Sequence, residues 1–221
     1  MRIANFKDYE LIDTSLGQRL ERWGNIILIR PDPQVIWDTP KKNPLWKNAH
    51  AVYHRSNTGG GAWEKLKDIP EVWKIKYSYL TFRLKPMGFK HTGIFPEQAV
   101  NWDFVSKKIE NSPRKLKVLN LFAYTGAATL ACAQAGAEVC HIDASKGMVA
   151  WARENANASN LEDKPIRWLV DDCVKFVERE IRRGNKYDGI IMDPPSYGRG
   201  PCGEIWKLEE QLFPLVSLCS K

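Results

Sequence analysis

The sequence predicts an α/β fold: an open sheet of parallel strands, preceded by a small domain rich in β-structure. Three observations predict it. Four apolar runs alternate with helix-length segments in the second half of the chain, each run is followed directly by polar residues, and residues 1–88 show no helical periodicity. Because parallel strands joined by helices end at one edge of their sheet, we expect a ligand to bind across that edge.

The first of these strands and the turn after it lie in residues 117–129 (KVLNLFAYTGAAT). The apolar residues within 118–122 are typical of a buried parallel strand. Gly126 allows a tight turn close to a ligand, since glycine adopts backbone conformations that other residues avoid. Ala127 then begins a helix, so this block predicts a strand, a turn and a helix in immediate succession.

Three further strands are expected, each followed by acidic residues: 138–142 before Asp143, Ile166–Val170 before Asp171 and Asp172, and 187–192 before Asp193. The expected helices are a connecting helix at 97–111 and later ones at 127–135, 145–159, 174–183 and 204–220. Ser145 is the residue type that caps helix N-termini, and it stands where the 145–159 helix begins.

The N-terminal part is expected to contain five short strands, at residues 10–12, 25–30, 51–54, 74–77 and 80–84. Turn-forming residues separate them, and the glycines at 59–61 are expected at a hairpin tip. Five of the nine tryptophans fall here, interleaved with arginine and lysine. Exposed tryptophans could stack on bases, whereas buried ones fill the core of a small sheet. We favour the core for most of them.

The charge of the chain is unevenly placed. Residues 1–90 contain 16 Lys and Arg against 9 Asp and Glu, an excess of +7, whereas residues 91–221 contain 17 of each sign. A phosphate backbone is the commonest partner of such a basic segment, so RNA or DNA binding is expected there. The alternative is a basic face that only contacts solvent.

Composition excludes several other classes of protein. No apolar run approaches the length that spans a bilayer, and the N-terminus lacks the apolar stretch of a signal peptide. The five cysteines are scattered, with no C-x-x-C pair, which argues against a zinc site and for a reducing compartment. We therefore expect a soluble cytoplasmic protein without a metal.

The acidic residues after the strands indicate the kind of ligand. Asp143, after the second strand, is placed to accept hydrogen bonds from two ribose hydroxyls, and an acid after the third strand can accept one from an adenine amino group. A dinucleotide site would need G-x-G-x-x-G after the first strand, but only Gly126 is present there. An adenosine without a pyrophosphate is therefore favoured over NAD.

Four segments carry a resemblance to a known family: LNLFAYTGAATL, HIDASKGMVAWARENA, DDCVKFV and IIMDPPSYGRG. They resemble the class I S-adenosylmethionine-dependent methyltransferases, and more narrowly the branch that modifies bases of large-subunit ribosomal RNA. HTGIFPEQAVNW, at 91–102, resembles the segment before the catalytic domain in that branch. The resemblance implies a Rossmann-like sheet, S-adenosylmethionine as cofactor and RNA as partner.

The resemblance also implies three parts: a basic β-rich domain at 1–88, a connecting segment and helix at 89–113, and the methyltransferase domain at 114–221. A class I sheet has seven strands, whereas only four can be assigned in this sequence, so an incomplete sheet is expected. Two alternatives to an active RNA methyltransferase remain. The chain could be a catalytically impaired remnant that binds RNA or cofactor, or a nicotinamide oxidoreductase, which the lone Gly126 disfavours.

The catalytic residues implied by the resemblance are Asp193, Pro194, Pro195 and Tyr197. The two prolines stiffen the loop after the fourth strand. In enzymes that methylate exocyclic amines, the aromatic residue that stacks on the flipped base follows the prolines directly. Here Ser196 intervenes, which favours the ribosomal RNA branch. Methylation of cytosine carbon-5 would need a cysteine in this loop, and Cys202 lies too far from it.

The cofactor-binding residues implied in the same way are Thr92, Gly93, Gln98, Phe122, Tyr124, Gly126, Asp143, Ala144, Ser145, Asp172 and Cys173. Asp143 is assigned to the ribose, with capping of the 145–159 helix as the alternative. Asp172 is preferred to Asp171 for the adenine, with capping of the next helix as the alternative. Residues 91–98 are expected to close over the cofactor as a lid, unless they form an ordinary linker.

Overall fold

The computed structural model describes residues 4–56 and 60–221. These residues form two compact units, one ending at Glu97 and the other running from Gln98 to Lys221. The division falls within the connecting segment expected at 89–113. Within the described ranges, no helix is both long and apolar enough to cross a membrane.

The first unit contains a five-stranded sheet in sequence order and a separate two-stranded hairpin. The sheet strands are β1 (Tyr9–Ser15), β2 (Gln18–Trp23), β3 (Ile26–Pro31), β4 (Ala51–Arg55) and β5 (Gly61–Lys65). The hairpin strands are β6 (Trp73–Tyr77) and β7 (Leu80–Leu84). All pairings are antiparallel except that of β3 with β4. The five predicted strands are confirmed, but β2 and β5 were not predicted. The tip expected at 59–61 includes residue 59, which lies outside the described residues.

The core of this unit is largely aromatic and aliphatic. Leu20, Ile27 and Ile29 pack with Trp46 and Ala49 in one buried cluster. Of the five tryptophans, three are buried (Trp23, Trp46 and Trp73), whereas the Trp37 side chain is 48% exposed. The prediction that most of these tryptophans fill the core is therefore confirmed.

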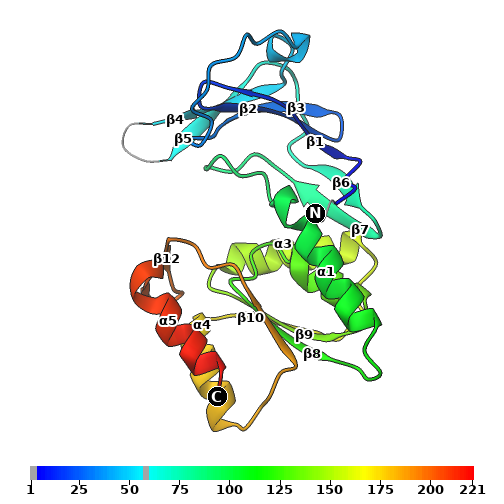
Figure 1. Ribbon diagram of the computed structural model, residues 1–221, viewed down its shortest axis with the longest axis vertical. Coiled ribbons are helices and arrows are strands. Elements are labelled where there is room, and N and C mark those ends of the chain that lie inside the picture. The colour runs from blue at the N-terminus through cyan, green and yellow to red at the C-terminus, as the bar shows by residue number, and fades with distance from the viewer. Residues whose placement is uncertain (1–3, 57–59) are drawn as a thin grey trace. The chain divides into compact units, whose positions relative to one another are not determined.

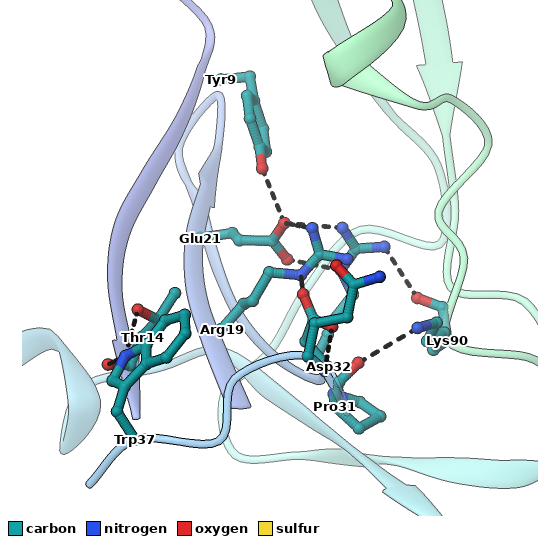
Figure 2. Close-up of polar contacts among 10 residues, drawn as sticks. Tyr9, Thr14, Arg19, Glu21, Pro31, Asp32, Trp37 and Lys90 are labelled. Carbon is teal, nitrogen blue, oxygen red and sulfur yellow. Dashed lines mark hydrogen bonds and ion pairs between the residues drawn. The ribbon is translucent and has the colours of Figure 1, made fainter. Parts of the chain in front are cut away.

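A buried ion pair crosses the same sheet. Glu21 on β2 accepts hydrogen bonds from the guanidinium of Arg30 on β3 and from the hydroxyl of Tyr9 on β1. Figure 2 shows the network around Glu21, from Tyr9 to Lys90. Because charged residues inside a strand obscure its apolar alternation, Glu21 and its neighbours explain why β2 was not predicted.

The second unit is built on a four-stranded parallel sheet in the order β10-β9-β8-β11. Its strands are β8 (Lys117–Leu121), β9 (Glu138–Asp143), β10 (Ile166–Val170) and β11 (Gly189–Met192). Its helices are α1 (Ala99–Glu110), α2 (Ala127–Gln134), α3 (Lys146–Ala158), α4 (Cys173–Arg182) and α5 (Leu208–Cys219). The predicted α/β class and the four parallel strands are confirmed, with the fourth strand beginning at Gly189 rather than 187.

Side chains alternate between the two faces of the sheet along each strand, so the buried residues form two separate clusters, one on each face. Val118 and Val139 pack on one face of the sheet with Ile109 of α1 and Cys132 of α2, whereas residues such as Leu119 and Cys140 pack on the other with α4 and α5. Figure 1 shows α4 and α5 on the opposite side of this sheet from α1. Since the helices cover both faces, the edge where the strands end remains for a ligand.

The helix predicted at 204–220 begins only at Leu208. The residues before it form a hairpin of β12 (Tyr197–Arg199) and β13 (Ile205–Lys207). The turn contains Gly203 at a φ of +90°, a conformation that favours glycine. This hairpin buries Trp206, and that burial outweighs the helical pattern that predicted a longer helix.

Candidate functional site

The structure brings the acidic residues that follow the strands to one edge of the sheet. Asp143 ends β9, and Asp172, Gly126 and Asp193 follow β10, β8 and β11; the strands are neighbours in the order β10-β9-β8-β11. The backbone N–H of Asp171 donates to the carbonyl of Asp143 at 3.1 Å, which joins the ends of β10 and β9. The expected gathering of these residues at the carboxyl edge is therefore observed.

The turn after β8 has an unusual backbone. Phe122 and Tyr124 both have positive φ, +54° and +51°, and Gly126 has a φ of +86°. A non-glycine residue in this region costs on the order of 1–3 kcal/mol, and such strain is concentrated at functional sites. Gly126 is also required for space, because a Cβ there would lie 2.9 Å from the Cβ of Ala152.

The carboxylate of Asp143 holds this turn in place. One oxygen accepts from the backbone N–H of Tyr124 and the other from that of Ser145, both at 2.8 Å. Burial raises the pKa of Asp143, and these two hydrogen bonds oppose the rise. A carboxylate has about four acceptor sites, so each oxygen keeps one for a ligand hydroxyl. The cap of α3 is Ser145, whose hydroxyl accepts from Met148, and not Asp143.

Buried polar side chains support the turn from behind. Asn120 donates to the hydroxyl of Thr129 at 2.9 Å, and that hydroxyl lies 2.9 Å from Nδ1 of His141. Asn155 donates to the carbonyl of Thr125 within the turn itself. Burial lowers the pKa of His141 to about 3, so its ring is neutral at physiological pH. This agrees with a structural role for the histidine.

At the end of β10 the two adjacent acids have different partners. Asp172 is the N-cap of α4, and its Oδ1 accepts from the backbone N–H of Lys175 at 2.9 Å. The capping contact is therefore present, and the assignment of Asp172 to the adenine stays a prediction. Asp171 forms an ion pair with Arg179. Next along the chain, the thiol sulfur of Cys173 accepts from the backbone N–H of Phe122 at 3.4 Å, which links α4 to the turn after β8.

The residues of the expected lid are divided between the two units. Gln98 belongs to the second unit, where its side-chain amide donates to Oδ2 of Asp193 at 3.3 Å. Thr92 and Gly93 belong to the first unit. Thr92 is completely buried, and within the described parts of the chain its hydroxyl has no hydrogen-bond partner. The lid therefore stays a prediction.

The loop after β11 is anchored by a residue that sequence reasoning missed. The indole N–H of Trp206 donates to the carbonyl of Pro195 at 2.7 Å, and the ring lies 4.7 Å from that of Phe122. Trp206 thus connects the Asp193–Tyr197 loop with the turn after β8. The sequence feature that could have indicated this role is a single tryptophan that follows a polar, glycine-rich segment. Tyr197 begins the hairpin and is 54% exposed.

Comparison with known proteins identifies this arrangement. The sequence profile of the S-adenosylmethionine-dependent methyltransferase family matches residues 29–206. The chain belongs to this family, and its cofactor is S-adenosylmethionine. A crystal structure of an S-adenosylmethionine-dependent methyltransferase from Agrobacterium tumefaciens is 41% identical, with a TM-score of 0.94, over 99% of this chain and 70% of that one. The nicotinamide alternative is therefore wrong, and the expected class of enzyme is confirmed.

More distant similarities agree with the fold. A protein described as a methyltransferase and solved with S-adenosylhomocysteine is 20% identical, with a TM-score of 0.75, over 98% of this chain and 59% of that one. The ribosomal RNA large subunit methyltransferase K/L of Pseudoalteromonas atlantica is 30% identical over 166 residues, 75% of this chain. The chain spans only 22% of that relative's length.

Proposed function

We propose that this enzyme methylates a base in RNA, with large-subunit ribosomal RNA as the first candidate. The observation that carries the proposal is the loop at 193–197, which ends in the exposed Tyr197 and is connected to the turn after β8 through Trp206. The relatives named as large-subunit ribosomal RNA methyltransferases support the substrate. The excess charge of +7 in residues 1–90 supports contact of this unit with the RNA backbone.

The arrangement of the second unit fits the adenosine part of the cofactor. Asp143 retains acceptor capacity for the ribose hydroxyls, with Ala144 and Ser145 following it along the same edge. Asp172 and the backbone N–H of Cys173 are assigned to the adenine, because Arg179 already neutralises Asp171. The backbone around Phe122, Tyr124 and Gly126 is assigned to the methionine part. Gln98, together with Thr92 and Gly93 of the predicted lid, would close over it.

When bound, the cofactor supplies a methyl group activated by its sulfonium. The protein's task is then to align the accepting atom with that methyl, so positioning supplies most of the catalysis. We assign this task to Asp193, Pro194, Pro195 and Tyr197, with the tyrosine ring stacking on the flipped base. Cys202 lies in the exposed turn of the hairpin, which gives no support to a covalent cytosine mechanism.

Methyl transfer tests the proposal directly. The protein should transfer radiolabelled methyl groups from S-adenosylmethionine to unmethylated large-subunit ribosomal RNA made by transcription. Tyr197→Ala should lower kcat/KM for RNA about 10- to 100-fold, because base–aromatic stacking contributes roughly 1–3 kcal/mol. Phe104→Ala, which removes another exposed ring of the same unit, should change it little. Tight binding of RNA and S-adenosylhomocysteine without transfer would instead support the remnant alternative.

Trp206 should act on the rate rather than on cofactor binding. Trp206→Phe keeps a ring beside Phe122 but removes the donor to the Pro195 carbonyl. A loop displaced by a fraction of an ångström aligns the base poorly, so we expect kcat to fall about 10-fold. The KM for S-adenosylmethionine should stay within about twofold. Trp168→Phe, at a half-buried tryptophan of β10 in the same unit, is the matched control. An unchanged kcat in Trp206→Phe would refute this role.

A further inference from the structure

The outer face of the β12–β13 hairpin extends beyond Tyr197, and the proposed chemistry does not use its other residues. We infer that its outer face binds single-stranded RNA next to the target base, with Arg199 contacting a phosphate and Ile205 contacting a neighbouring base. This inference rests on the proposed function, because it assumes that the base at the 193–197 loop belongs to RNA.

The register of the hairpin defines that face. Tyr197 pairs with Lys207, Gly198 with Trp206 and Arg199 with Ile205. Directly opposed residues of a sheet share a face, and the faces alternate along each strand. The hairpin therefore has two different faces. The inner face carries Gly198 and the buried Trp206, and the outer face carries Tyr197, Arg199, Ile205 and Lys207.

All four side chains of the outer face are exposed, and two of them are large and apolar. Tyr197 is 54% exposed and Ile205 49%. Such side chains in solvent are unfavourable unless a partner covers them, and here they sit diagonally across the same small face. Each is paired across the hairpin with a cation. This interleaving of stacking surface with positive charge is the pattern of single-strand nucleic-acid binding sites.

The charges on this face also favour an anionic partner. Lys207 forms an ion pair with Glu210 at 2.8 Å. For Arg199, no ion pair or hydrogen bond of the side chain is found within the described ranges. A guanidinium binds phosphate through two parallel hydrogen bonds, whereas an exposed lysine acts as a point charge. Arg199 is therefore the residue of this face best suited to hold the RNA backbone.

The hairpin is held firmly enough to serve as a platform. Trp206 ties its inner face to Pro195, and Glu204 in its turn pairs with Lys175 of α4. The backbone N–H of Gly200 donates to the carbonyl of Glu204 at 2.8 Å and closes the turn. Two residues of a strand span about 7 Å, so Arg199 lies within reach of a phosphate adjacent to a base stacked on Tyr197.

RNA binding across a salt series tests the assignment. The probe is a fluorescent single-stranded fragment of large-subunit ribosomal RNA, titrated with the intact protein in saturating S-adenosylhomocysteine. Arg199→Gln should weaken binding about 3- to 10-fold and reduce the slope of log affinity against log salt by about 0.7, the value for one phosphate contact. Ile205→Ser should weaken binding without changing the slope. Affinity for S-adenosylhomocysteine should be unchanged in both.

The control is Arg182→Gln, which removes the same charge from the exposed end of α4 in the same unit. If Arg199→Gln and Arg182→Gln bind RNA equally, the hairpin assignment is wrong while the proposed function stands. If the unaltered protein neither binds nor methylates RNA, the proposed function fails and the hairpin assignment with it. A change in self-association on Arg199→Gln, with RNA binding intact, would mean that a second copy covers this face.

Discussion

Arg30→Met is expected to lower the free energy of unfolding of the N-terminal unit by about 3–5 kcal/mol, the cost of leaving a buried charge without its partner. Glu21 is completely buried, and only 5% of Arg30 is exposed. Removal of the guanidinium would leave the Glu21 carboxylate with the Tyr9 hydroxyl at 2.8 Å and with Arg19 as its remaining cation, at 4.0 Å. Urea unfolding, followed by amide hydrogen exchange of β1–β3, measures the change.

The geometry explains why this loss is large. Nε and Nη2 of Arg30 donate to the two oxygens of Glu21 at 2.5 and 2.8 Å, and Nη1 donates to the carbonyl of Lys90 at 3.1 Å. The guanidinium also lies 4.9 Å from the ring centre of Trp23. Burial opposes the charged form of Arg30, but the hydrogen bond and charge of Glu21 outweigh it and raise its pKa.

Two variants separate this effect from the loss of any arginine. Arg22→Met removes a partly exposed ion pair with Glu10, which joins β2 to β1 of the same sheet, and such surface pairs contribute about 0–1 kcal/mol. The double variant Glu21→Leu with Arg30→Met replaces both charges by apolar side chains and should recover part of the stability. If Arg30→Met and Arg22→Met lower the free energy of unfolding equally, the buried ion pair stabilises the unit no more than the surface pair does.

Asp143→Ala is expected to weaken the binding of S-adenosylhomocysteine by roughly 2–4 kcal/mol, about 30- to 1000-fold. The substitution would remove the two charge-assisted hydrogen bonds that we propose between Asp143 and the ribose. It also releases the backbone N–H groups of Tyr124 and Ser145, which the carboxylate now orients. Isothermal titration calorimetry measures the affinity.

Asp143→Asn separates the contribution of the proposed ribose hydrogen bonds from that of the turn that the carboxylate orients. The amide keeps one oxygen acceptor of similar shape, so part of the turn is retained while the charge is lost, and an intermediate affinity is expected. Asp163→Ala removes an exposed carboxylate of the same unit and should bind like the unaltered protein. Unchanged affinity in Asp143→Ala would show that the ribose lies elsewhere.

The parallel sheet could be predicted because its determinants are local. Apolar runs such as 118–122, a lone Gly126 and an acid after each of the other three strands are read directly from neighbouring residues. The order of the strands was not predicted, and the structure places β11 beside β8 rather than beside β10. The same local pattern placed Asp143, Asp172 and Asp193 at one edge, where the structure has them.

What the sequence alone determined is the α/β class, the four parallel strands, the strand–turn–helix block around Gly126 and the class of enzyme. Only the tertiary structure decided the rest. β2 forms a strand because Glu21 pairs with Arg30 on the neighbouring strand. Residues 205–207 form a strand rather than the start of the helix because Trp206 packs against Phe122 and donates to the carbonyl of Pro195. Glu21 and Arg30 lie on different strands, 9 residues apart, whereas Trp206 lies 11 residues from Pro195 and much farther from Phe122. The free energy of burying a charge or a large ring depends on its partner, and local pattern carries no information about such a partner.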